Sequence, residues 1–281
     1  MTEQAGQHSP HLDEREQQQA AAHAHLGPVV IHEIIREQGE AELDRPFGGL
    51  AWSGLAAGLS IGFSSVAQAY LQSGLPEAEW SRLVASFGYS LGFLIVILGQ
   101  QQLYTESTLT ALIPTLTRRT LRSLFQTLRV WTIVLVANLA GAAVFGAIAA
   151  QRGIFSPSAY AAMSKLSAQT MAHGFAQTAI TGGSAGWLIG LMVWLLPGAG
   201  AARPIIIIVL SYVVALCQFP HIIAGSVEAV FGVASGTASA SDFLLRFFLP
   251  TLIGNTIGGA ALVALLNHAP LAKELASVSK N

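Results

Sequence analysis

The chain has 281 residues, of which 10% are charged and 52% are hydrophobic, and its formal net charge is -1. Its mean hydropathy of +0.55 is too high for an ordinary soluble domain and indicates an integral membrane protein. The balanced charge, without a concentrated basic patch, argues against a nucleic-acid partner. The single cysteine, Cys217, excludes a disulfide within the chain.

The N-terminal segment is polar and Gln-rich. It lacks the basic region and apolar core of a secretory signal, so residues 1–28 are expected to form a disordered cytosolic tail. Its histidines, such as His8 and His11, have no partners at a metal-site spacing, and neither a metal nor another cofactor is expected. Residues 46–269 are predicted to form the transmembrane domain, and residues 270–281 a second cytosolic tail.

Six apolar stretches are long enough to cross a hydrocarbon core of about 30 Å, which takes roughly 20 helical residues. They lie near 48–73, 82–117, 129–150, 170–197, 204–235 and 243–267. Arginines crowd residues 118–129 and Arg203 lies between the fourth and fifth stretches, which places both termini in the cytoplasm. Arg82 and Arg152 fall on the other side, so the bias is moderate. The predicted fold is all-α.

The second and fifth stretches are each interrupted by polar residues. The second breaks at 99–108, and the fifth at 218–221, where Pro220 removes a backbone donor. Such breaks are tolerated at membrane depth only where protein or water satisfies the backbone. Asn138 and Gly141 in the third stretch parallel Asn255 and Gly258 in the sixth. The pattern predicts a 3+3 inverted repeat with a solute site near the midplane.

This layout resembles the formate/nitrite transporter family over about residues 48–267. The sequence Tyr89-Ser90-Leu91-Gly92-Phe93, followed by Leu103-Tyr104-Thr105, is similar to the family's Phe-Ser-Leu-Gly-Leu and Leu-Phe-Thr segments. The residues Phe219, His221, Ile222 and Ala224 are similar to its Phe-Glu-His-Ser-Ile-Ala. The resemblance implies an aquaporin-like protomer in a homopentamer in the inner (cytoplasmic) membrane, and an amphipathic cytosolic helix over residues 29–45.

The resemblance also implies a pore that is constricted on both sides of a central His221. By position, Tyr89, Phe93 and Leu103 would form the outer constriction and Val214 would belong to the inner one. Thr105 would line the chamber beside His221.

The chain departs from the family pattern at three places near this site. Thr170 stands near the start of the fourth stretch, where the family usually has a basic residue, Gly186 replaces an Asn, and Pro220 replaces a Glu. The loss of the basic residue and of the Asn weakens the attraction of an anion. His173 is close enough in sequence to replace part of the lost basic function, or it lies at the lipid headgroups.

Three ionisable residues at membrane depth are candidates for function, each with a structural alternative. His221 can donate a hydrogen bond or a proton to a weak-acid anion, or it satisfies the broken backbone. Glu106 either lines the pore or caps a half-helix N-terminus. Glu228 either lines the pore or pairs across a protomer interface.

The leading hypothesis is a channel or transporter for a small monovalent anion or its weak acid, of the formate, nitrite, hydrosulfide or short-carboxylate class, with or without proton transfer at His221. Glu106 and Glu228 favour the alternative of a neutral or cationic solute. An enzyme or receptor is a third class, but no Ser/His/Asp set, phosphate loop or metal-ligand spacing supports it. The expected partners are membrane lipids, the solute and other copies of the chain.

Overall fold

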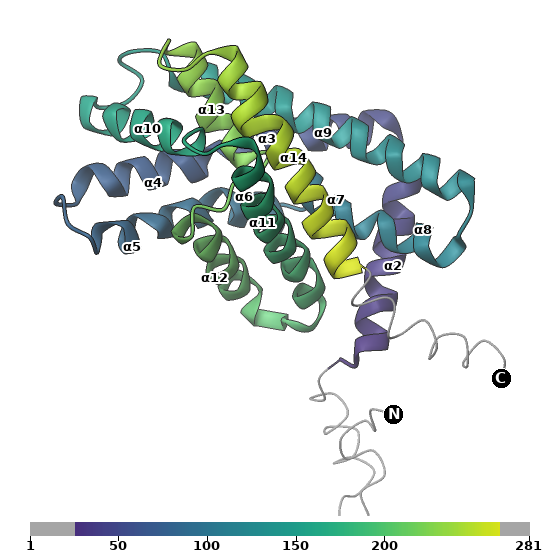
Figure 1. Cartoon of the computed structure of the whole chain (residues 1–281). Coiled ribbons are helices and arrows are strands. Elements are labelled where there is room, and N and C mark those ends of the chain that lie inside the picture. Colours follow the sequence, from purple (N-terminus) through teal and green to yellow (C-terminus); the bar gives the residue numbers. More distant parts are fainter. Residues whose placement is uncertain (1–25, 265–281) are drawn as a thin grey trace, which may run out of the picture.

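The computed structural model describes residues 26–264, and their regular elements are all helices (Figure 1). The α-helices are α2 (Pro28–Asp44), α3 (Phe47–Ser60), α4 (Gly62–Gly74), α5 (Ser81–Ala85), α6 (Ser90–Leu98), α7 (Tyr104–Thr110), α8 (Leu112–Arg118), α9 (Leu121–Ala149), α10 (Pro157–Thr170), α11 (Phe175–Leu195), α12 (Arg203–Leu216), α13 (Ala224–Ala234) and α14 (Leu249–Thr256). The short or π-helical elements are η1 (Ser86–Tyr89), η2 (Leu196–Gly198), η3 (Gly200–Ala202), η4 (Asp242–Phe248) and η5 (Ile257–Ala264). The expected tails, up to residue 25 and from residue 270, lie outside the described residues.

Helical segments long and apolar enough to cross a membrane account for about half of the described residues. Within residues 26–264 they are Phe47–Gly74, Ser81–Leu98, Leu121–Ala149, Phe175–Gly198 and Asp242–Ala260. The predicted fifth span consists instead of two shorter apolar helices, α12 and α13, with the break between them. The predicted second span likewise stops at Leu98 and resumes at Tyr104 as α7 and α8.

Each break begins with the same backbone turn. Gln100 and Gln218 have φ values of 52° and 54°, in the left-handed region that ends helices and that few residues other than glycine adopt. The next amide then donates back five residues, from Gln101 N–H to the Val96 carbonyl and from Phe219 N–H to the Val214 carbonyl, both at 2.9 Å. The helix ends are therefore closed by hydrogen bonds inside the protein, as membrane depth requires.

Two glycines let pairs of long helices cross in direct contact. A Cβ on Gly58 of α3 would lie 2.1 Å from the carbonyl oxygen of Asn138 on α9, and one on Gly186 of α11 would lie 2.2 Å from that of Asn255 on α14. No side chain fits at such distances. Gly186, which the sequence comparison treats as the loss of a polar Asn, is thus a packing residue at a helix crossing.

Two helices differ from the sequence-based prediction. Helix α9 starts at Leu121 rather than near 129, because the Thr120 hydroxyl accepts a hydrogen bond from the Ser123 amide at 3.2 Å and caps it. Helix α10 is unpredicted, and the fourth apolar helix starts at Phe175 rather than at 170. At 14 residues, with many polar side chains, α10 escapes a search for long apolar runs.

Helices α2 and α10 occupy corresponding places in the two halves of the chain. Each starts with a proline, Pro28 or Pro157, and each precedes a helix that starts with a phenylalanine, Phe47 or Phe175. Helix α2 packs against α7 and α8, whereas α10 packs against α4 and α13. Figure 1 shows the two helices at opposite ends of the molecule.

Candidate functional site

The break after α6 is held in place by one side chain from α9. The Asn138 Oδ1 accepts a hydrogen bond from the Tyr104 amide at 2.8 Å, at the start of α7. Its Nδ2 donates to the carbonyl of Gly54 on α3 at 2.7 Å and to the carbonyl of Gln102 in the break at 2.9 Å. One fully buried amide thus satisfies three backbone groups and ties the break to two long helices.

The break after α12 is held in the same way by Asn255. Its Oδ1 accepts from the Ile222 amide at 2.8 Å, and its Nδ2 donates to the carbonyls of Gly182 and Pro220, both at 2.9 Å. The loop groups that bind the two asparagines are 118 residues apart in the sequence (102 to 220, and 104 to 222). The two halves therefore build the two breaks on the same hydrogen bonds.

His221 and Thr105 join the two breaks at the centre of the molecule. The Thr105 Oγ1 and the His221 Nε2 lie 2.9 Å apart, and both side chains are almost fully buried. The His221 Nδ1 accepts hydrogen bonds from the amides of Ile223 at 3.3 Å and Ala224 at 3.2 Å. Because Nδ1 is an acceptor, the proton of the neutral ring sits on Nε2, which donates to Thr105.

Bulky apolar side chains surround this polar pair. Phe93 and Leu103 are completely buried, and the Phe93 ring meets the His221 ring edge-on with centroids 5.1 Å apart. The Tyr89 ring lies 5.3 Å from the Phe93 ring. Phe93 and Leu103 line neither of the two large cavities of the described residues, so these side chains lie in a closed part of the structure.

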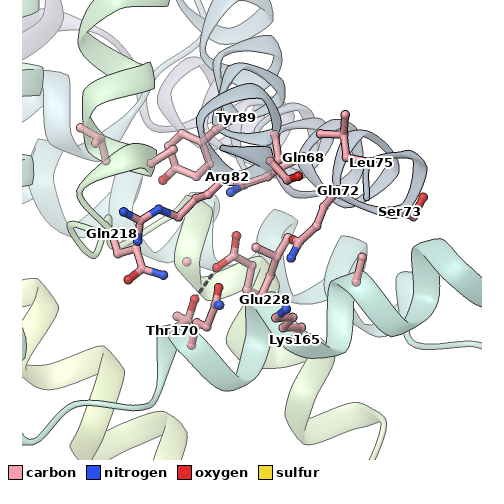
Figure 2. Close-up of a pocket in the computed structure, with 18 of the residues that line it drawn as sticks. Gln68, Gln72, Ser73, Leu75, Arg82, Tyr89, Lys165, Thr170, Gln218 and Glu228 are labelled. Carbon is pink, nitrogen blue, oxygen red and sulfur yellow. Dashed lines mark hydrogen bonds between the residues drawn. The ribbon is translucent and has the colours of Figure 1, made fainter. Parts of the chain in front are cut away.

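A first cavity of about 790 Å³, the α10-side cavity, lies between α4, α5, α10 and α12 (Figure 2). Of the predicted site residues it is lined by Tyr89, Thr170, Val214, His221 and Glu228. Val214, expected at the constriction opposite Tyr89, therefore opens on the same side as Tyr89. Its place on the last turn of α12, directly before the break, brings it to this wall.

Glu228 is the buried acidic group of the α10-side cavity. Its side chain is 7% exposed, and its Oε1 accepts from the Ser65 hydroxyl at 3.0 Å. Its Oε2 accepts from the Thr170 hydroxyl, the bond drawn as a dashed line in Figure 2. Arg82 and Lys165 line the same cavity, so both signs of charge are present. Glu228 is thus bound by two hydroxyl groups of its own chain.

A second cavity of about 700 Å³, the α2-side cavity, is lined by α2, the first break and the segment around Arg203. Glu106 lines this cavity, whereas Glu228 lines the other. The two carboxylates therefore face different cavities, because the two breaks enter the molecule from different sides. Glu106 lies in the first turn of α7, which also fits the helix-cap alternative.

Glu42, on α2, is a cavity-lining residue that the sequence analysis missed. It is 7% exposed and accepts hydrogen bonds from the hydroxyls of Ser107 and Thr110. Burial raises the pKa of this carboxyl group, while the two hydroxyls and nearby Arg45 oppose the shift. A signal was present, because Glu42 shares the buried face of α2 with Ile35.

Comparison with known proteins gives one consistent family. A model of the formate/nitrite transporter family matches residues 29–269. The chain is 38% identical over 252 residues to the inner membrane protein YfdC of Escherichia coli (strain K12), across 90% of this chain and 81% of that protein. It is 24% identical over 255 residues to the formate channel BtFdhC of Bacillus thuringiensis, across 88% of this chain and 96% of that protein.

Solved structures show the same fold at low sequence identity. A pentameric formate channel with formate bound aligns with a TM-score of 0.65 at 20% identity, covering 84% of this chain and 99% of that one. An ion channel of the same family aligns with a TM-score of 0.73 at 15% identity, covering 86% and 98%. Together with the apolar helices, these similarities confirm the predicted all-helical membrane fold.

Proposed function

Because the chain belongs to the formate/nitrite transporter family, we propose that it is a membrane channel or transporter for small monovalent anions or their weak acids. The solute class includes formate, nitrite, hydrosulfide and short carboxylates. The observation that carries the proposal is the buried Thr105–His221 pair, because His221 lines the α10-side cavity and Gln102, just before Thr105 in the chain, lines the α2-side cavity.

The role of His221 follows from its hydrogen bonds. An anion that leaves a cavity for the apolar centre loses water, which is costly unless a donor replaces it. The His221 Nε2–H is such a donor and is shared with Thr105. The amides of Ile223 and Ala224 already donate to Nδ1. A proton on Nδ1 would face these two N–H groups and would break both hydrogen bonds. This geometry favours donation of a hydrogen bond over transfer of a proton.

The constriction belongs to the proposal as well. Phe93 and Leu103 are assigned to the closed segment between the cavities, with Thr105 and His221 as its polar centre. Tyr89, Val214 and Thr170 are assigned to the wall of the α10-side cavity. A closed apolar segment with one polar pair favours small solutes that can shed most of their water.

The membrane arrangement is proposed from several supports. The matching hydrogen bonds of Asn138 and Asn255 and the opposite placement of α2 and α10 support a 3+3 inverted repeat. A solved structure of the same fold is a pentamer, which supports a homopentamer here. The similarity to an inner membrane protein supports that location, with the α2 end in the cytoplasm by the arginine distribution.

A neutral or cationic solute is the second candidate. Glu228 in one cavity and Glu42 and Glu106 in the other favour it, because carboxylates disfavour anions nearby. Cationic residues in both cavities, such as Lys165 and Arg203, keep an anionic solute as the first candidate.

Flux into proteoliposomes tests the proposal. The purified chain is reconstituted, and uptake of formate, nitrite, methylammonium and urea is compared with that of empty vesicles. His221→Leu, which removes the donor, is expected to lower anion uptake about tenfold or more, whereas His221→Gln retains an N–H near the Nε2 position and keeps part of it. Gln151→Asn, at an exposed amide that lines neither cavity, is the control. If none of the four solutes enters faster than in empty vesicles, the transport function is wrong.

A further inference from the structure

Each of the two cavities contains a glutamate carboxylate that accepts a hydrogen bond from a threonine hydroxyl. The helix that supplies the glutamate in one half of the chain supplies the threonine in the other half. In the α10-side cavity the Thr170 hydroxyl donates to Glu228, and in the α2-side cavity the Thr110 hydroxyl donates to Glu42. Both carboxylates are 7% exposed. Each cavity thus has one buried carboxylate that is held by a threonine on a different helix.

Sequence positions show that these pairs correspond. Thr110 and Glu228 are 118 residues apart, the same spacing that relates the hydrogen-bonded groups of the two breaks (102 to 220). Glu42 and Thr170 are 128 residues apart, the spacing that relates the carbonyls bound by the two asparagines (54 to 182). The internal repeat therefore places a carboxylate–threonine pair at the same point in each half, on α2 and α7 in one and on α10 and α13 in the other.

Both pairs face the proposed path. Glu42 and Thr110 line the α2-side cavity beside Gln102 of the first break, and Glu228 and Thr170 line the α10-side cavity beside His221 of the second. Among the described residues, the ion pairs involve other acidic groups, so neither Glu42 nor Glu228 is neutralised at close range by a cationic side chain. Their hydroxyl partners leave the charge of an ionised carboxylate in place.

We infer that Glu42 and Glu228 are matched charge-selectivity residues, one in each cavity, that disfavour free anions and favour neutral or cationic forms of the solute. The inference rests on the proposed transport function and concerns which charged form passes. Helix α2, which the sequence predicts as a cytosolic helix, then contributes directly to selection through Glu42. Duplication at both ends of the path makes selection independent of the direction of flow.

The physical basis is the electrostatic energy near a buried charge. An ionised carboxylate in partly desolvated surroundings repels an anion a few ångströms away and attracts a cation of the same size. Salt screens such sites less than it screens exposed charges. Replacement of Glu by Gln removes the charge and keeps an oxygen acceptor and a donor for the two hydroxyl partners, so the fold is retained.

The test measures the ratio of formate to methylammonium uptake into proteoliposomes at pH 8, because burial raises the pKa of Glu42. Glu42→Gln and Glu228→Gln are each expected to raise the ratio about threefold, and the double variant about tenfold. Glu37→Gln on the exposed face of α2 and Glu79→Gln at an exposed position of the α10-side cavity are matched controls that leave it unchanged.

An exchange variant provides a second arm. Thr170→Glu combined with Glu228→Thr copies the arrangement of Glu42 and Thr110, and it is expected to keep the native ratio. A ratio that stays the same in both single variants and in the double variant, while both probes still enter, overturns this inference and leaves the transport function standing. If neither probe enters vesicles that contain the native chain, the transport function fails and this inference fails with it.

Discussion

The two breaks share a backbone and differ in the residue at their centre. Asn138 and Asn255 bind equivalent groups, and both breaks start at a glutamine with positive φ. Yet the position that holds Leu103 in the first break holds His221 in the second. The repeated hydrogen bonds therefore define a common frame, and the chemistry at the centre comes from substitutions in one half.

The residue before the centre differs for a related reason. In the first break the Gln102 amide donates to the Ser53 hydroxyl at 3.0 Å. In the second break the residue is Pro220, which has no N–H to satisfy. The equivalent of Ser53 in the second half, Thr181, is half-buried and bonds within its own helix. The proline therefore removes a requirement that the first half meets with a serine.

The largest expected loss of stability comes from removing the asparagine side chains that hold the two breaks. Asn138→Ala and Asn255→Ala each leave three backbone groups without their partner, which costs about 3 kcal/mol or more. Both variants are expected to lower the thermal unfolding temperature in detergent by a similar, large amount. Gln151→Ala, at an exposed amide, is the control. A large loss in only one of the two would show that the halves are not energetically equivalent.

The two glycine helix crossings also test whether the two halves are energetically equivalent, with a smaller expected loss of stability. A methyl group on Gly58 or Gly186 would overlap the carbonyl of the facing asparagine. The Ala variants are expected to lose about 1–3 kcal/mol of unfolding free energy each, as overpacked sites do. Gly74→Ala, where a methyl group meets open space, is the matched control. Native-like stability of Gly186→Ala would contradict the packing role of that residue.

The difference between the two breaks predicts an unequal pair of variants. Ser53→Ala leaves the Gln102 amide without its acceptor and is expected to cost about 1 kcal/mol. Thr181→Ala, at the equivalent position of the other half, is expected to have almost no effect because Pro220 needs no acceptor. Thermal unfolding of the two variants in the same detergent provides the comparison, and equal losses would refute this account of Pro220.

The smallest effect concerns the docking of α2 against α8. Arg118 of α8 and Glu40 of α2 form an ion pair at 3.1 Å, but both are about one-third exposed. Arg118→Ala is expected to weaken α2 by less than about 0.5 kcal/mol, and the effect should vanish in high salt. Hydrogen exchange of the α2 amides at two salt concentrations measures it. A large, salt-independent change would mean that Arg118 acts by packing.

Much of the frame could be predicted from the sequence. Long apolar runs identify most membrane helices because lipid demands them, and the polar runs at 99–108 and 218–221 locate the breaks. The match between Asn138 and Asn255 indicates the repeat, although two short matching stretches do not show what those side chains bind. Thr105 and His221 were correctly expected beside one another from the family resemblance.

The rest depends on contacts between residues far apart in the chain. Periodicity places Glu42 on the buried face of α2 but cannot identify Thr110 as its partner. Hydropathy misses α10 because its buried face is short and its other face is polar. The side on which Val214 opens depends on the rotation of α12 about its axis, which an almost uniformly apolar sequence leaves undefined.

The difference between Leu103 and His221 at equivalent positions also depends on both halves being encoded in one chain. In a symmetric dimer of identical three-helix chains, a mutation that creates a central histidine enters both breaks at once and puts two imidazoles next to each other. A single chain that carries both halves is free of this coupling. Each half then accumulates changes on its own, so one histidine, one proline and one carboxylate–threonine exchange can coexist in a pore whose scaffold stays symmetric.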